Sequence, residues 1–132
     1  MKNLDLIAAR TAQEIIKETS ANKAGEVDNL ITKALGVLQE NGVYAAMLYL
    51  YSRTSTDKSI AEKSRPKLVA LVAELGLQIP EQRDASTVLK FLTDRVCNDL
   101  DRLLLVKQLW EQTLIYARFG AKARSAAEDK IS

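Results

Sequence analysis

Histidine is absent from this 132-residue sequence, and cysteine occurs once, at Cys97. The chain therefore lacks the commonest general base, the usual partner of a serine or cysteine nucleophile, and the commonest metal ligand. A single cysteine without histidine also excludes an intrachain disulfide and any ordinary zinc site. The lone thiol favours a reducing, cytoplasmic setting, and we expect Cys97 to be buried as a small hydrophobic residue.

Sequence motifs of the common enzyme classes are missing as well. Neither the phosphate-binding loop GxxxxGK[ST], nor the dinucleotide fingerprint GxGxxG, nor the nucleophile elbow GxSxG occurs. Asp99 and Asp101 lie two residues apart, which places them on nearly opposite faces of a helix, where they do not share a metal ion. We therefore expect a protein with no catalytic residues, no metal site, no cofactor and no small-molecule substrate.

Membrane-spanning and secretory segments are not indicated either. No apolar run approaches the roughly 20 residues that a membrane-spanning helix needs. The first residues, Met1 to Asp5, lack the basic region and apolar block of a signal peptide. Hydrophobic residues make up 47% of the chain, which is ordinary for a globular protein. We expect one cytoplasmic domain over residues 1–132, without membrane contact.

Proline and glycine are scarce, at two and five residues, and apolar positions recur at intervals of three and four, which predicts helices. The pattern predicts a first helix over residues 4–19, a second that ends at Asn41, and a third over residues 43–53. Gly42 is the expected stop, because glycine can adopt the left-handed conformation that closes a helix. Asn-Gly is also a hairpin signal, but both flanks here favour helix.

Two internal loops are predicted, at residues 53–59 and 76–85. Between them Pro66 interrupts a helical pattern, and because proline is costly inside a helix we expect a break near Ser64. A short helix over residues 86–96 leads into a long terminal helix, which is capped near Asn98 or Asp99. The predicted fold is all-α: a compact single-domain bundle of five to seven helices with a long C-terminal helix.

Positive charge collects in this terminal helix. In residues 102–124 five cations stand against one anion, Glu111, while the whole chain carries a net charge of only +2. At 100° per residue, Lys107, Arg118 and Lys122 fall within about 60° of one another. Such a stripe is suited to phosphate groups. The simpler interpretation is a solvated helix face whose cations favour the helix dipole.

Two other surface features are candidates for contact with a partner. Tyr116 and Phe119 lie beside the stripe and are suited to stacking on bases or to contacting a partner, with core packing as the alternative. A second cationic segment, residues 53–67, would extend the basic surface if the fold placed it beside the terminal helix. Tyr44 and Tyr51 lie seven residues apart, share a helix face, and offer a separate docking surface.

Two short blocks of the sequence resemble a known family. The first block is residues 39–50, QENGVYAAMLYL, where a helix pattern ends at Asn-Gly and restarts with small and aliphatic residues before an aromatic residue. The second block is residues 115–123, IYARFGAKA, a closing segment of basic, aromatic and alanine residues. Both resemble the small all-helical subunit of the Cmr (type III-B) RNA-guided CRISPR effector complex. The chain departs from the family at Ile115, where many members carry tryptophan, and at Ala117-Arg118, where a Lys-Arg step is expected.

The resemblance implies a non-catalytic subunit that acts in antiviral defence. It implies stacking along the guide RNA–target RNA duplex, with contacts to other subunits of the Cmr complex and to copies of itself. In this interpretation Arg118 and Lys122 contact the RNA backbone, helped by Lys107 and Arg124. Two alternatives stay open: a helical protein–protein adaptor without nucleic-acid contact, and the equivalent small subunit of a Csm (type III-A) complex.

Overall fold

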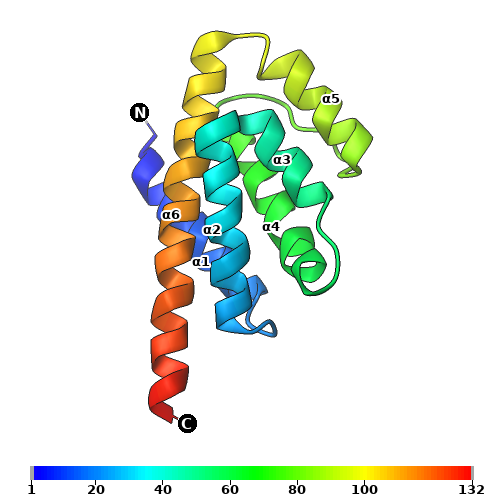
Figure 1. Ribbon diagram of the computed structural model, residues 1–132. Coiled ribbons are helices and arrows are strands. Elements are labelled where there is room, and N and C mark those ends of the chain that lie inside the picture. Colours follow the sequence, from blue (N-terminus) through cyan, green and yellow to red (C-terminus); the bar gives the residue numbers. More distant parts are fainter. Residues whose placement is uncertain (1, 132) are drawn as a thin grey trace.

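The computed structural model describes the backbone of residues 2–131 and the side chains of residues 2–129. Within this range the chain forms six helices and no strand, so the predicted all-α fold with a long C-terminal helix is confirmed (Figure 1). The helices are α1 (Leu4–Glu18), α2 (Ala24–Asn41), α3 (Val43–Tyr51), α4 (Thr56–Ala73), α5 (Ala85–Arg95) and α6 (Leu100–Ile131). None of them combines the length and hydrophobicity that crossing a membrane requires.

The long helix α6 packs against α1 on one side and α2 on another, and α3, α4 and α5 complete the bundle (Figure 1). Contacts at the start and the end of α1 show that α1 runs in the same direction as α6: Asp5 meets Tyr116, and Thr19 meets Arg124. The buried residues of α6 recur at intervals of three and four: Val106, Leu109, Trp110, Thr113, Leu114, Ala117 and Ala121. One face of α6 therefore belongs to the core for about four turns.

Trp110 is the largest fully buried side chain among the described residues. Its indole Nε1 donates a hydrogen bond of 2.8 Å to the backbone carbonyl of Leu68, which lies in α4. A buried tryptophan needs such a partner, because an unpaired indole N–H in an apolar core is costly. The bond therefore fixes α6 against α4 across the centre of the molecule.

Small residues let α1 and α6 approach each other closely. Ala8 and Ala12 on α1, with Ala117 and Ala121 on α6, are all buried. A Cβ atom added to Gly120 would lie 3.0 Å from Cγ1 of Ile16, at the limit of normal contact. The spacing of these two helices is thus set by residues that carry almost no side chain.

The junction between α2 and α3 depends on Gly42. Its φ of +96° and ψ of −172° lie outside the left-handed helical region that the sequence led us to expect, in a region essentially reserved for glycine. Its N–H still donates to the carbonyl of Leu38, and its own carbonyl accepts from Ala46, at 2.9 and 3.0 Å. One residue therefore ends α2 and starts α3.

The break expected near Ser64 does not occur, because α4 continues from Thr56 to Ala73 through Pro66. Proline removes the N–H that would bond the carbonyl of Glu62. Both Pro66 and Glu62 are exposed, so this carbonyl lies on the solvated side of α4, where water can satisfy it. On the buried side the hydroxyl of Ser64 donates to the carbonyl of Ile60 at 2.8 Å.

Three predicted boundaries shift by a few residues. The predicted loop over residues 53–59 is shorter than expected, because α4 begins at Thr56, while α3 ends at Tyr51 rather than at residue 53. The second loop, predicted over residues 76–85, spans residues 74–84, since α4 ends at Ala73 and α5 begins at Ala85. At the start of α6 the cap is Asp99, whose Oδ1 accepts from the N–H of Arg102 at 3.0 Å.

Replacing Trp110 by Phe should lower the free energy of unfolding by about 2 kcal/mol, because a cavity forms and the bond to Leu68 is lost. Urea denaturation followed by far-ultraviolet circular dichroism measures this change. Leu104→Ala, on the same helix but 54% exposed, is the control and should change stability by less than about 0.5 kcal/mol. Equal effects of the two substitutions would contradict the central role of Trp110.

Gly42→Ala should destabilise the protein by about 1–3 kcal/mol, because alanine does not tolerate these backbone angles. Gly36→Ala provides the matched control within α2. Gly36 has no positive φ, and nothing lies within 4 Å of the added Cβ, so alanine there should stabilise by roughly 0.5–1 kcal/mol. Thermal denaturation of both variants should therefore give shifts of opposite sign.

Candidate nucleic-acid interface

Arg118 and Lys122 lie one turn apart on α6, on the side that faces α2. Both approach the carboxylate of Asp28: Arg118 Nε lies 4.0 Å from Oδ1, and Lys122 Nζ lies 3.5 Å from Oδ2. The two cationic side chains are 40% and 48% exposed, and the Asp28 side chain only 22%. The acid thus lies deeper than the cations, and their outer sides remain open to solvent.

Asp28 cannot balance this pair completely, because one carboxylate meets two cations. Its Oδ1 also accepts a hydrogen bond of 3.1 Å from the hydroxyl of Thr32. The Nε atom of Arg118 is buried but has no hydrogen-bond partner. The pair therefore keeps net positive charge, so an anion arriving from solvent would find charge that Asp28 does not balance, although the buried Nε of Arg118 is out of its reach.

Lys107 lies on the same side of α6, eleven residues before Arg118, or about 16 Å along the helix axis. Its side chain is half-buried, and within the described part of the chain it forms no ion pair. Glu111 lies between the two positions and is also half-buried. The predicted stripe is therefore a row of three cations along α6, in which Arg118 and Lys122 lie close together and Lys107 lies apart from them.

Arg124 has a different environment from the other cations of α6. Its guanidinium donates to the backbone carbonyls of Thr19, Ser20 and Asn22 at 3.1, 3.0 and 2.5 Å, and its Nε pairs with Glu128 at 2.8 Å. These carbonyls close the end of α1 and the turn that follows, where no helical N–H is available. Arg124 joins α6 to that turn, so we leave it out of the proposed RNA-contacting set.

Tyr116 and Phe119, predicted together as stacking residues, have different environments. Tyr116 is half-buried, and its hydroxyl donates to Oδ1 of Asp5 on α1. That hydrogen bond raises the pKa of the Tyr116 hydroxyl, because it stabilises the protonated form. Phe119 is 62% exposed. Of these two residues, Phe119 is the one whose ring is largely exposed to solvent.

A surface pocket that the sequence did not predict opens between α1 and α6. Its cavity volume is about 380 Å³, and it is lined by Ala9, Ala12, Gln13, Ile16, Tyr116 and Gly120. The lining combines every third or fourth residue of α1 with two residues of α6, one turn apart. The pocket exists because small residues face each other across the helix pair, a relation that no local pattern reveals.

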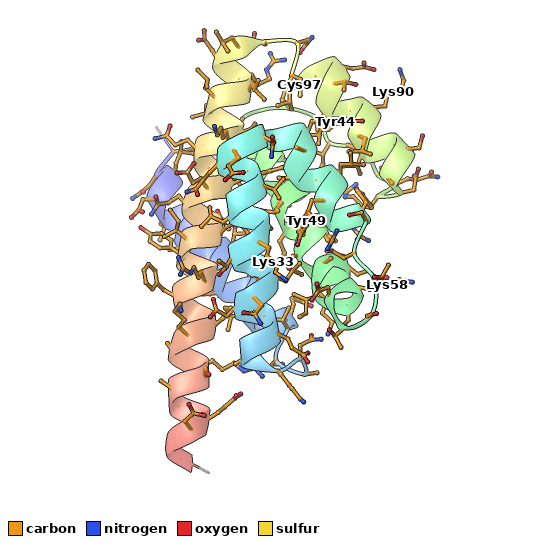
Figure 2. The ribbon with its side chains drawn as sticks, viewed as in Figure 1. Lys33, Tyr44, Tyr49, Lys58, Lys90 and Cys97 are labelled. Carbon is orange, nitrogen blue, oxygen red and sulfur yellow. The ribbon has the colours of Figure 1, made fainter. Side chains whose placement is uncertain are left out.

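The second cationic segment, residues 53–67, is mostly engaged in contacts within the protein. The guanidinium groups of Arg53 and Arg65 lie over the rings of Tyr49 and Tyr51, 3.9 and 4.2 Å from the ring centroids. Elsewhere in the segment, Lys63 donates to Asn22 Oδ1 at 3.0 Å, and Lys67 lies 3.3 Å from Glu14 and 3.9 Å from Glu18. Lys58 is exposed, but it lies on the opposite side of the molecule from α6 (Figure 2). This segment does not extend the basic surface of α6.

The tyrosine face that suggested an adaptor is only partly exposed. Tyr51 donates its hydroxyl to the carbonyl of Arg83 at 2.6 Å, and burial raises the pKa of that hydroxyl. Tyr44 is 39% exposed, on the side of α3 near α5 (Figure 2). Leu48, one turn later, is 46% exposed. The open surface on α3 is therefore Tyr44 with Leu48, rather than Tyr44 with Tyr51.

The remaining reactive groups have ordinary surroundings. Cys97 is half-buried between α5 and α6, and burial raises the pKa of its thiol, which disfavours the reactive thiolate. Asp99 caps α6, as described above, while Asp101 is exposed. Among the side chains that the structure describes, no group of three or more His, Cys, Asp or Glu residues is placed to hold a metal ion.

Comparison of the chain with protein-family models, with curated proteins and with solved structures finds no match. A proposal of function therefore rests on the two sequence blocks and on the geometry of α6 and its neighbours.

Arg124→Ala should lower the free energy of unfolding by about 2 kcal/mol, because three backbone carbonyls lose a charged donor. Arg124→Lys should recover only part of this loss, since one ammonium group cannot reproduce the planar fork of a guanidinium. Urea denaturation measures both values. Arg95→Ala, which truncates an exposed arginine, is the control. An unchanged free energy of unfolding for Arg124→Ala would contradict the role of Arg124 in holding the turn after α1.

Proposed function

We propose that this chain is the non-catalytic small subunit of a type III-B CRISPR ribonucleoprotein effector complex, in which it lies along the guide RNA–target RNA duplex. The observation that carries the proposal is the pair Arg118 and Lys122, two half-exposed cations that share one recessed carboxylate, Asp28. The sequence block around this pair is one of the two that resemble the family, and Arg118 is the residue of the pair that maps cleanly onto it.

The geometry of the pair suits a phosphate backbone better than a small anion. Both side chains project from one rigid helix, and Lys107 continues the row about 16 Å away. A row of separated cations matches a chain of phosphates, whereas a single anion needs converging donors. Such contacts do not depend on base sequence, as expected for a subunit that accommodates any guide and target.

Apolar side chains at the other end of α6 support a place within a larger assembly. Leu100 and Leu104 lie one turn apart and are 69% and 54% exposed. Exposed aliphatic residues grouped on one helix face are typical of protein–protein contact. We infer that this end meets other subunits of the complex or a second copy of the chain, while the Arg118–Lys122 end faces RNA.

The second candidate is a helical adaptor that docks another protein and does not contact nucleic acid. Tyr44 and Leu48, exposed one turn apart on α3, favour it. The equivalent subunit of a type III-A complex is a related candidate that the sequence does not separate from the type III-B subunit, and the identity of the co-purified proteins would distinguish the two.

Affinity purification of the tagged chain from its host, with identification of proteins and sequencing of RNA, tests the proposal. We expect a multi-subunit ribonucleoprotein with short repeat-derived guide RNAs. The double variant Arg118→Gln, Lys122→Gln should bind RNA more weakly at low and moderate salt. It should also make the slope of the logarithm of affinity against the logarithm of salt concentration shallower by about two units. Neutral replacements are preferable here, because glutamates would meet Asp28 and repel it.

The matched control is the double variant Lys58→Gln, Lys90→Gln. It removes the same charge from two exposed lysines on the side of the molecule away from the Arg118–Lys122 end (Figure 2). It should leave the salt dependence unchanged, and both double variants should keep the thermal midpoint close to that of the natural chain. Recovery of protein partners without RNA, or equal salt slopes for the two variants, would contradict the proposal.

A further inference from the structure

Phe119 and the pocket between α1 and α6 lie next to each other. Phe119 directly precedes Gly120 and follows Tyr116 by three residues, and both of these line the pocket. Residues three apart on a helix are surface neighbours, so the exposed ring of Phe119 stands at the edge of the opening. A ligand that enters this apolar pocket could therefore also contact the exposed aromatic ring.

The chemistry of the pocket suits a flat and largely apolar group. Ala9, Ala12 and Gly120 contribute little or no side chain to its lining, and no carboxylate lines it. The hydroxyl of Tyr116 is already bound to Asp5, so the ring of Tyr116 acts as an apolar wall. Gln13, exposed at the opposite edge, supplies an amide that can donate and accept. Its volume of about 380 Å³ falls in the range of small-ligand sites.

Positive charge lies beyond Phe119, on the side of α6 that faces α2, where Arg118 and Lys122 approach Asp28. Lys122 follows Phe119 by three residues and Arg118 directly precedes it, so both cations are within one turn of the ring. A ligand whose flat group enters the pocket would have to extend past the ring of Phe119 to bring a negative group to Lys122, and further still to reach Arg118, which projects from the opposite side of α6 to Tyr116 and Gly120. An RNA strand is such a ligand, since its bases are flat and its phosphates repeat along its length.

We propose that the pocket and the ring of Phe119 hold one unstacked base of an RNA strand that passes over Phe119, so that its neighbouring phosphates lie at Lys122 and then at Arg118. The inference rests on the proposed function. It adds to the phosphate contacts a contribution to affinity that requires a base but does not depend on which base it is. Stacking of a base on an aromatic side chain is worth about tenfold in affinity and tolerates every base, because each base has a π-face.

Two other occupants fit the same surface less well. An amphipathic peptide helix needs a continuous apolar track, but Gln108 and Gln112 interrupt the face of α6 between Leu104 and Phe119. If two copies of the chain packed their Phe119 rings together across a two-fold axis, the Arg118–Lys122 pairs of both copies would also come together. Repulsion between these like charges opposes such a dimer. Charge and shape together favour RNA.

The test compares two short RNA strands of equal length, an oligouridine and the same ribose-phosphate backbone without bases. Affinities for the full chain are measured at low salt by nuclear magnetic resonance titration, with the side-chain amide of Gln13 as the reporter in the pocket. We expect oligouridine to bind about tenfold more tightly than the abasic strand and to shift the Gln13 signal. Phe119→Ala should abolish this difference while leaving the affinity for the abasic strand unchanged.

Two further variants serve as controls. Phe119→Tyr keeps an aromatic ring and should preserve the preference, whereas Leu104→Ala removes an exposed apolar side chain elsewhere on α6 and should have no effect. Equal binding of the two strands by the natural chain would overturn this inference but leave the backbone contact standing. Binding of neither strand would overturn both. A Gln13 shift produced by an acidic phenylalanine-containing peptide, and not by RNA, would replace the inference with a protein partner.

Discussion

The packing of α6 between α1 and α2 is the constraint on which the rest of the molecule depends. One face of α6 is committed to the core, where Trp110 bonds to Leu68 in α4, and its later turns are held by Arg124 at the end of α1. Because a helix is rigid over this length, burying one face determines which residues face outward. Arg118 and Phe119 are exposed as a consequence of what the opposite side of α6 packs against, and they need no loop to position them.

Much of the fold follows from sequence for local reasons. Apolar periodicity identified every helix, and Gly42 marked a junction that only glycine can form. The missed feature of the fold has a physical cause outside local sequence. Pro66 is tolerated because the carbonyl it leaves unpaired lies on the solvated side of α4, and which side is solvated depends on tertiary packing.

The candidate site was less predictable, because charge on a helical wheel does not show what lies opposite. The stripe on α6 could be found from spacing, but Asp28, which shares its charge with Arg118 and Lys122, comes from another helix. Arg124 looked equivalent to its neighbours and instead bonds the turn after α1. The pocket was invisible, since it requires the small residues of α1 and α6 to meet. A run of alanines on α1 that matches the alanine-glycine run of α6 was the one available signal.

Ultraviolet crosslinking of the protein to RNA in its native assembly, followed by mass spectrometry of the crosslinked peptides, tests the central claim most directly. The account predicts that RNA attaches to peptides from residues 115–124 of α6, with Phe119 as the main crosslinked residue, because it is the aromatic side chain beside the cations that solvent can reach. Crosslinks confined to α3, at Tyr44 and its neighbours, or a protein recovered without any attached RNA, would contradict it.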